Sequence, residues 1–176
     1  RSLPRRPGPV AASPAPVRSR FRDAGDAKRS ARIRLNPLNG IGYAPLPAGF
    51  TQAKFNQNEE VIEHTNEDTI AIALELIQGN SGVHLAEYNF VQALAQHCRE
   101  RNILLIIDEV QTGIGRTGTW FAFQQTGILP DAMALAKGLG SGFPIGACVT
   151  KGEAAKVFTP GKHGSTFGGN PLACVA

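Results

Sequence analysis

Two ionisable residues, Asp108 and Lys137, each stand close behind a run of apolar residues. A carboxylate at the end of the run ILLII, 103–107, is costly to bury unless a positive group partners it. Lys137 follows DAMAL, 131–135, after one alanine, and the glycine-rich stretch behind it leaves room for a ligand around the amine. Out of water, a lysine amine becomes a nucleophile that condenses with carbonyl groups. The two residues therefore indicate carbonyl chemistry in which a carboxylate takes part.

Taken singly, each residue also has an ordinary explanation. Asp108 would serve as a helix cap or surface residue, and Lys137 as a solvated lysine at a strand end. Together they lie 29 residues apart, which is about the length of one strand–helix–strand crossover. The ends of neighbouring strands are only about 5 Å apart, so a ring between them would meet a carboxylate on one side and an amine on the other. Pyridoxal chemistry requires this arrangement, because the aldehyde condenses with a lysine while an acid keeps the ring nitrogen protonated.

The apolar pattern around both residues predicts the elements that must position them. Buried strands are expected at 70–77, 103–107, 131–135 and 145–149, an amphipathic helix at 87–101, and shorter helical segments at 120–125 and 153–158. Strands that alternate with helices at this spacing are typical of an α/β fold with a largely parallel sheet. Ligands bind such sheets beyond the carboxyl ends of the strands. Asp108 and Lys137 both follow predicted strands, so we expect them at this functional edge.

Composition and cysteine usage narrow the class of protein. The 176 residues are 42% hydrophobic and 18% charged, as in an ordinary soluble domain. No apolar run approaches the roughly 20 residues that a membrane helix needs. The three cysteines are widely spaced, and the four histidines lack the spacing of metal ligands. We therefore expect a cytoplasmic protein with reduced thiols, no metal site and no membrane partner.

The beginning of the chain differs in composition from the rest. Residues 1–34 contain ten Lys/Arg and two Asp/Glu, a charge of +8, whereas the remainder contains eight and twelve, a charge of −4. A basic arm for nucleic acid, an organelle transit peptide and a translated wrong reading frame would each look like this. Phe21 is the one aromatic residue there, so a series of stacking platforms for bases is missing and a nucleic-acid partner is not expected. We interpret residues 1–40 as a basic Arg/Pro/Ala-rich segment, disordered or foreign, and 41–176 as part of a cofactor-binding domain.

Three segments carry a resemblance to a known family. LLIIDEVQTGIGRTG (104–118), DAMALAKGLGSGFPIGA (131–147) and KHGSTFGGNPLAC (162–174) resemble the class III aminotransferases in their order and spacing. The resemblance implies an incomplete large domain of the aspartate-aminotransferase-like fold (fold type I), a mostly parallel sheet flanked by helices. It also implies transamination with pyridoxal 5′-phosphate as cofactor, a small-molecule amino donor and 2-oxoglutarate as substrates, and a homodimer with shared active sites.

The resemblance also assigns roles to particular residues around the cofactor. Lys137 would hold the cofactor covalently and, once freed, move the proton between substrate and cofactor. Asp108 would pair with the ring nitrogen, Val110 would pack on one ring face, and Gln111 would hydrogen-bond the phenolic oxygen of the ring. Glu109 is counted among the cofactor-binding residues, and we expect it to support the residues that contact the cofactor directly.

Three further residues are assigned to the phosphate and the substrate by the same resemblance. Thr166 would bind the cofactor phosphate of the partner subunit, and Ser165 before it would touch substrate; an ordinary turn or cap is the alternative for both. Asn80 stands where the family has a glutamate. In the family this glutamate would pair with an active-site arginine when acetylornithine is the amino donor and release it when glutamate is the donor. Because Asn80 is uncharged, we expect it to alter the discrimination between the donors, unless it is a plain turn residue.

Within the family, the chain resembles the N-acetylornithine aminotransferases of arginine biosynthesis. Gln111 favours the ornithine-like branch, and Phe167 stands where ornithine enzymes usually have tyrosine. The implied reaction converts N2-acetylornithine and 2-oxoglutarate into N-acetylglutamate 5-semialdehyde and glutamate. Ornithine, succinyldiaminopimelate or 4-aminobutyrate as donor, and an inactive fragment, are the alternatives. The family's glycine-rich phosphate loop and aromatic-His-Gly segment are not found in residues 1–40, and its substrate-binding arginine would fall beyond residue 176.

Overall fold

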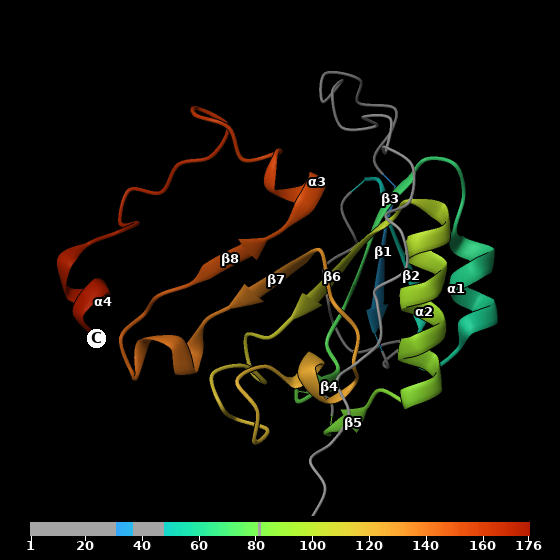
Figure 1. Ribbon diagram of the computed structural model, residues 1–176, viewed down its shortest axis with the longest axis horizontal. Helices are drawn as coiled ribbons and strands as arrows, with labels where there is room; N and C mark the ends of the chain where they lie inside the picture. The colour runs from blue at the N-terminus through green and yellow to red at the C-terminus, as the bar shows by residue number, and fades with distance from the viewer. Residues whose placement is uncertain (1–30, 37–47, 81) are drawn as a thin grey trace, which may run out of the picture.

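Six strands form the sheet that organises the chain (Figure 1). The computed structural model describes residues 31–36, 48–80 and 82–176. In spatial order the strands are β2 Phe50–Lys54, β1 Ala31–Asn36, β3 Thr69–Leu74, β6 Leu104–Asp108, β7 Ala132–Leu135 and β8 Ala147–Thr150. Neighbouring strands are parallel from β2 through β7, whereas β8 runs antiparallel to β7. The expectation of an α/β fold with a largely parallel sheet is confirmed.

Two helices, α1 and α2, lie side by side against one face of this sheet (Figure 1). The helices are α1 Asn58–His64, α2 Tyr88–Arg101, α3 Gly152–Ala155 and α4 Pro171–Val175, with the 3₁₀ helices η1 Ala122–Gln125 and η2 Lys137–Gly140. A short antiparallel pair, β4 Ile77–Gln78 with β5 His84–Leu85, lies between β3 and α2 in the chain. Among the described helices, none has the length and apolar character needed to cross a bilayer.

The core lies between α2 and the strands beneath it. Phe90, Leu94 and Cys98 follow one another at four-residue spacing on one side of α2, and all three are buried. They belong to the same apolar cluster as Leu105 and Ile107, which point from β6 toward the helix. Burial, together with the nearby negative charge of Asp131, raises the pKa of the Cys98 thiol to about 12. This packed face fixes the position of β6, and with it the strand end that carries Asp108.

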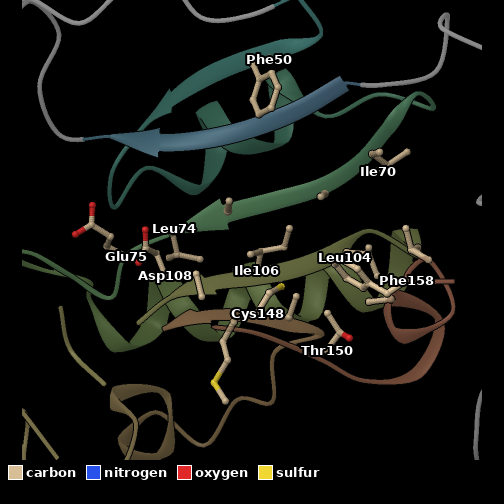
Figure 2. A pocket seen from close by; sticks show the side chains of 17 residues that line it. Phe50, Ile70, Leu74, Glu75, Leu104, Ile106, Asp108, Cys148, Thr150 and Phe158 are labelled. Atoms are coloured by element: carbon tan, nitrogen blue, oxygen red, sulfur yellow. The ribbon is translucent and has the colours of Figure 1, made fainter. Parts of the chain in front are cut away.

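The opposite face of the sheet forms an apolar groove of about 500 Å³ (Figure 2). Successive side chains of a strand point to opposite faces, so Leu104, Ile106 and Asp108 of β6 all line this groove. Figure 2 shows the carboxylates of Glu75 and Asp108 at one end of the groove and Phe158 at the other. Asp108 therefore stands at the point where an apolar strand face meets the carboxyl edge of the sheet.

The positions of most elements agree with the sequence from β3 onward. The strand expected at 70–77 is β3, which ends at Leu74, with β4 beginning at Ile77. The helix expected at 87–101 is α2, and the strands expected at 103–107, 131–135 and 145–149 are β6, β7 and β8. The strand β1, Ala31–Asn36, lies inside the stretch 1–40 that we interpreted as disordered or foreign, so that interpretation is wrong for these six residues. The physical reason is that β1 is held by pairing with β2 and β3, and both of these strands come later in the sequence. Residues 1–30 and 37–47 lie outside the described part.

Candidate active site

Asp108 is the last residue of β6 and stands at the carboxyl edge of the sheet. It is paired with Ala134 of the parallel neighbour β7, and the backbone N–H of Glu109 donates to the carbonyl oxygen of Ala134 at 2.9 Å. The Asp108 side chain is half-buried, and its Oδ1 accepts a hydrogen bond of 2.9 Å from the N–H of Val110. Its Oδ2 has no hydrogen-bond partner among the described residues. One carboxylate oxygen is thus held by the chain and the other is left to bind a donor.

Lys137 lies at the same edge of the sheet, just after the neighbouring strand β7. It begins η2 two residues after the end of β7, three positions beyond the residue paired with Asp108. Its side chain is exposed, and no described carboxylate forms an ion pair with it. Its φ is 46°, in the left-handed region that L-residues adopt at a cost of about 1–3 kcal/mol. Strain of this kind persists where the surrounding structure imposes it, and it is frequent at functional sites.

The loop after Asp108 packs directly against the turn that carries Lys137. A Cβ added to Gly113 would lie 2.8 Å from the carbonyl oxygen of Glu109 and 3.1 Å from Cδ2 of Leu135. A Cβ added to Gly138 would be 3.6 Å from Cβ of Ile114. Gly113 can therefore not carry a side chain in this arrangement. The contact holds the two site-bearing turns, after β6 and after β7, against each other.

Gln111 reaches across to a third segment, the turn after β4. A Cβ built on Gly79 would lie only 2.1 Å from Oε1 of Gln111, so the Gln111 side chain occupies the space directly over the Gly79 backbone. Asn80 follows Gly79 and is exposed. Val110 is half-buried next to Asp108. The structure thus brings Asn80 into the neighbourhood of Gln111, although 31 residues separate them in the chain.

Glu109 lies on the other side of the site residues and is 1% exposed. Its Oε2 accepts hydrogen bonds from the Thr112 hydroxyl and from the Ala122 N–H, the latter at 3.1 Å. Its Oε1 accepts a hydrogen bond of 2.9 Å from the Phe123 N–H. With both oxygens occupied inside the protein, this carboxylate does not face the edge where Asp108 and Lys137 stand. The structure therefore places Glu109 behind the residues at that edge, and its predicted part in cofactor binding stays a prediction.

Ser165 and Thr166 stand apart from the other predicted site residues. Both are exposed, in a turn where the Gly168 N–H donates to the carbonyl oxygen of Ser165 at 3.2 Å. The segment that carries them continues beyond β8 and α3, on the side away from β6 (Figure 1). No hydrogen bond among the described residues joins either of them to Asp108 or Lys137. Their predicted roles toward phosphate and substrate stay predictions.

Comparison with known proteins identifies the class of protein that this fold and edge define. A family model described as aminotransferase class-III matches residues 29–176. Acetylornithine aminotransferase from Aquifex aeolicus is 54% identical over 135 residues, which are 77% of this chain and 36% of that protein. The chain belongs to the class III aminotransferase family. It spans about a third of the length of the curated relatives that it matches.

Solved structures show the same fold. N-acetylornithine aminotransferase from Stenotrophomonas maltophilia K279a matches with a TM-score of 0.70 and 35% identity, over 84% of this chain and 36% of that one. The ornithine delta-aminotransferase of Plasmodium falciparum matches with a TM-score of 0.74 and 32% identity, over 84% of this chain and 38% of that one. The fold is therefore that of part of a fold type I aminotransferase, as the sequence predicted.

The residues at the edge suit a pyridoxal ring. The set combines a half-buried carboxylate with one unpaired oxygen, an exposed amine just after the adjacent strand, and an amide lying over Gly79. These are an acid for a ring nitrogen, a nucleophile for an aldehyde and a donor for a phenolic oxygen. The apolar groove meets this set only at Asp108, and neither Lys137 nor Gln111 lines it. Asp108 is therefore the point at which the groove adjoins the candidate site.

Proposed function

We propose that this chain is the cofactor-binding part of a pyridoxal-phosphate-dependent transaminase that converts N2-acetylornithine and 2-oxoglutarate into N-acetylglutamate 5-semialdehyde and glutamate. The observation that carries the proposal is the placement of Asp108 and Lys137. They stand at the carboxyl ends of two adjacent parallel strands, with Asp108 paired to Ala134, three residues before the lysine. The reaction would serve arginine biosynthesis in the cytoplasm.

The cofactor, when bound, supplies an electron-accepting ring that stabilises negative charge on the donor carbon. Asp108 would hold a proton at the ring nitrogen through its unpaired Oδ2, while the Val110 N–H fixes its other oxygen. Lys137 would anchor the ring through its amine, and the freed amine would then move the proton on the donor carbon. Val110 would pack on the ring, and Gln111 would donate its amide N–H to the phenolic oxygen.

The proposed donor rests on the relatives, and the proposed assembly on the exposure of two residues. The Aquifex and Stenotrophomonas proteins are acetylornithine aminotransferases, whereas the Plasmodium protein is an ornithine delta-aminotransferase. We propose acetylornithine for this chain because the sequence identity to the Aquifex protein is 54%. We further propose a homodimer in which Thr166 binds the cofactor phosphate of the partner subunit and Ser165 touches substrate. Exposure of both residues away from the edge of their own chain supports this arrangement.

Covalent trapping of the cofactor tests the proposal. In the full chain that carries these residues, borohydride reduction in the presence of pyridoxal phosphate should leave the pyridoxyl group on Lys137, as located by peptide mapping. Lys137→Ala should lose both the adduct and turnover, because it removes the anchor and the proton-moving amine together. Lys151 provides the matched control, since it already pairs with Asp131 at 3.7 Å at the opposite edge of the sheet. An adduct on Lys151 or Lys162 in place of Lys137 would refute the assignment.

A further inference from the structure

Glu109, which is buried, connects β7, the loop after β6 and η1 behind the candidate active site. Its backbone N–H donates to the Ala134 carbonyl oxygen of β7, and its own carbonyl oxygen accepts from the Gly113 N–H, both at 2.9 Å. Its side chain accepts from the Thr112 hydroxyl and from two backbone N–H groups, those of Ala122 and Phe123. All the polar groups of this one residue are thus engaged, with partners on β7, in the loop and on η1.

The two N–H groups that Glu109 binds are the first ones of η1. The opening N–H groups of a helix have no partner within the helix and need an acceptor from elsewhere. A capping side chain normally comes from the residue just before the helix. Here the acceptor lies 13 and 14 positions away in sequence, so the cap closes the whole loop from Glu109 to η1. The loop cannot shift along the edge of the sheet without breaking these hydrogen bonds.

Closing the loop fixes the two residues on either side of Glu109. Asp108 precedes it on the strand end, and Val110 follows it with its N–H on Oδ1 of Asp108. Because the Glu109 N–H also binds Ala134, the anchor sets the spacing between the β6 end and the strand that leads to Lys137. We infer that Glu109 is a positioning residue that holds Asp108 and Val110 in register with Lys137 for the cofactor. The inference rests on the proposed function.

Glu109→Gln is the sharpest substitution, because the shape is kept and one acceptor oxygen is lost. If the new amide N–H₂ takes the place of Oε1, it faces the Phe123 N–H. If it takes the place of Oε2, it faces the Ala122 N–H, although the Thr112 hydroxyl can turn to accept. Either orientation sets two donors against each other at about 3 Å. The amide therefore cannot replace the carboxylate at this position.

Thr69→Val supplies the matched control. Thr69 is equally buried, 1% exposed, and its hydroxyl accepts from the Asn66 N–H at 3.0 Å and donates to Asn66 Oδ1 at 3.2 Å. It starts β3, at the edge of the sheet opposite the candidate site. Its loss should lower the unfolding temperature without any effect on the cofactor. Thr112→Val, which removes one hydroxyl donor and keeps both amide hydrogen bonds, should give a smaller effect than Glu109→Gln.

The experiment measures three quantities in the full chain and its variants. They are hydrogen exchange at the Ala122 and Phe123 amides without cofactor, the Kd of pyridoxal phosphate by visible absorbance, and the unfolding temperature. Glu109→Gln should speed exchange at both amides and raise the Kd roughly tenfold, the equivalent of one lost hydrogen bond to a charged group. Thr112→Val should raise the Kd roughly two- to threefold, a fraction of a kcal/mol. Thr69→Val should leave the Kd within about twofold, well below a tenfold step.

The outcomes distinguish a failure of the proposed function from a failure of the positioning role of Glu109. A parent chain that binds no pyridoxal phosphate would overturn the proposed function, and this inference with it. A parent that binds it, with an unchanged Kd in Glu109→Gln despite faster exchange at the two amides, would overturn the inference alone and leave Glu109 as a stabilising residue. If Glu109→Gln does not fold, Thr112→Val decides: an unchanged Kd there would overturn the positioning role.

Discussion

Gly79→Ala should weaken cofactor binding without destabilising the chain, by displacing a side chain that is remote in sequence. The added Cβ would lie 2.1 Å from Oε1, 2.6 Å from Cδ and 2.7 Å from Nε2 of Gln111. Ordinary contacts between such atoms begin at about 3.5 Å, so the Gln111 amide must move by an ångström or more. Gln111 is exposed, so its side chain can swing into solvent at little cost. Gly79 does not have a positive φ, so its backbone also accepts alanine.

The expected magnitude follows from the one interaction that is lost. If Gln111 donates a hydrogen bond to the phenolic oxygen of the cofactor, its displacement costs about 0.5–1.5 kcal/mol. The Kd of pyridoxal phosphate should therefore rise roughly three- to tenfold. The free energy of unfolding without cofactor should change by no more than about 0.5 kcal/mol, as for most exposed substitutions.

A double-mutant cycle tests this reasoning without a further control variant. Gly79→Ala, Gln111→Ala and the double variant are compared by titrating the cofactor absorbance in the full chain. Because both substitutions remove the same hydrogen bond, the double variant should bind no more weakly than the worse single variant. Additive losses would show that Gly79 acts independently of Gln111. An unchanged Kd in Gly79→Ala, with a raised Kd in Gln111→Ala, would show that the alanine does not displace the amide.

Three other outcomes are expected. Asp108→Asn should lower turnover roughly 100-fold or more with cofactor still bound, because the amide cannot keep the ring nitrogen protonated; turnover near that of the parent would contradict this role. Asn80→Glu should move the ratio of the two half-reaction rates, measured in single-turnover absorbance, toward acetylornithine, and equal ratios would mark Asn80 as a turn residue. Alkylation followed by mass spectrometry should modify the exposed Cys148 and Cys174 and spare Cys98, since burial raises its pKa to about 12 and thiolates are the reacting form. Modification of Cys98 at the rate of the other two would show that α2 does not stay packed.

The sequence predicted those elements whose own residues carry a clear apolar pattern. In α2 the buried residues repeat at helical spacing over 14 residues, and in β6 five consecutive residues are apolar or end the run. The missed elements have no such pattern. α1 spans seven residues, four of them charged or histidine, and buries only Val61. β1 reads ARIRLN within a strongly basic stretch, and its strand character depends on pairing with β2 and β3.

The same distinction holds within the candidate site. Asp108 and Lys137 could be predicted because each follows an apolar strand, and parallel strands bring their carboxyl ends to one edge. The proximity of Gly79 to Gln111 could not, since it joins turns that are 32 residues apart and leaves no local pattern. Neither could the anchoring role of Glu109, whose partners on η1 are 13 and 14 residues away. A charged residue directly behind Asp108, followed by Thr112 and Gly113, was the available signal.

The candidate site combines a carboxylate held in place, that of Asp108, with a side chain that can move, that of Lys137. This combination suits the chemistry proposed for the site. Asp108 stands on a strand end that is tied to β7 and to η1 through Glu109, and its Oδ1 is held by the Val110 N–H. Lys137 has no ion pair within the described part of the chain, is exposed and carries its amine on a four-carbon stem. A partner for the ring nitrogen must stay in place while charge develops, because a dipole that reorients during the reaction loses part of its stabilisation. The amine, in contrast, must release the ring and then reach a second atom to move a proton. Rigidity at β6 and freedom at Lys137 are therefore both required, and a substitution that loosens the first should impair the reaction even when it touches neither cofactor nor substrate.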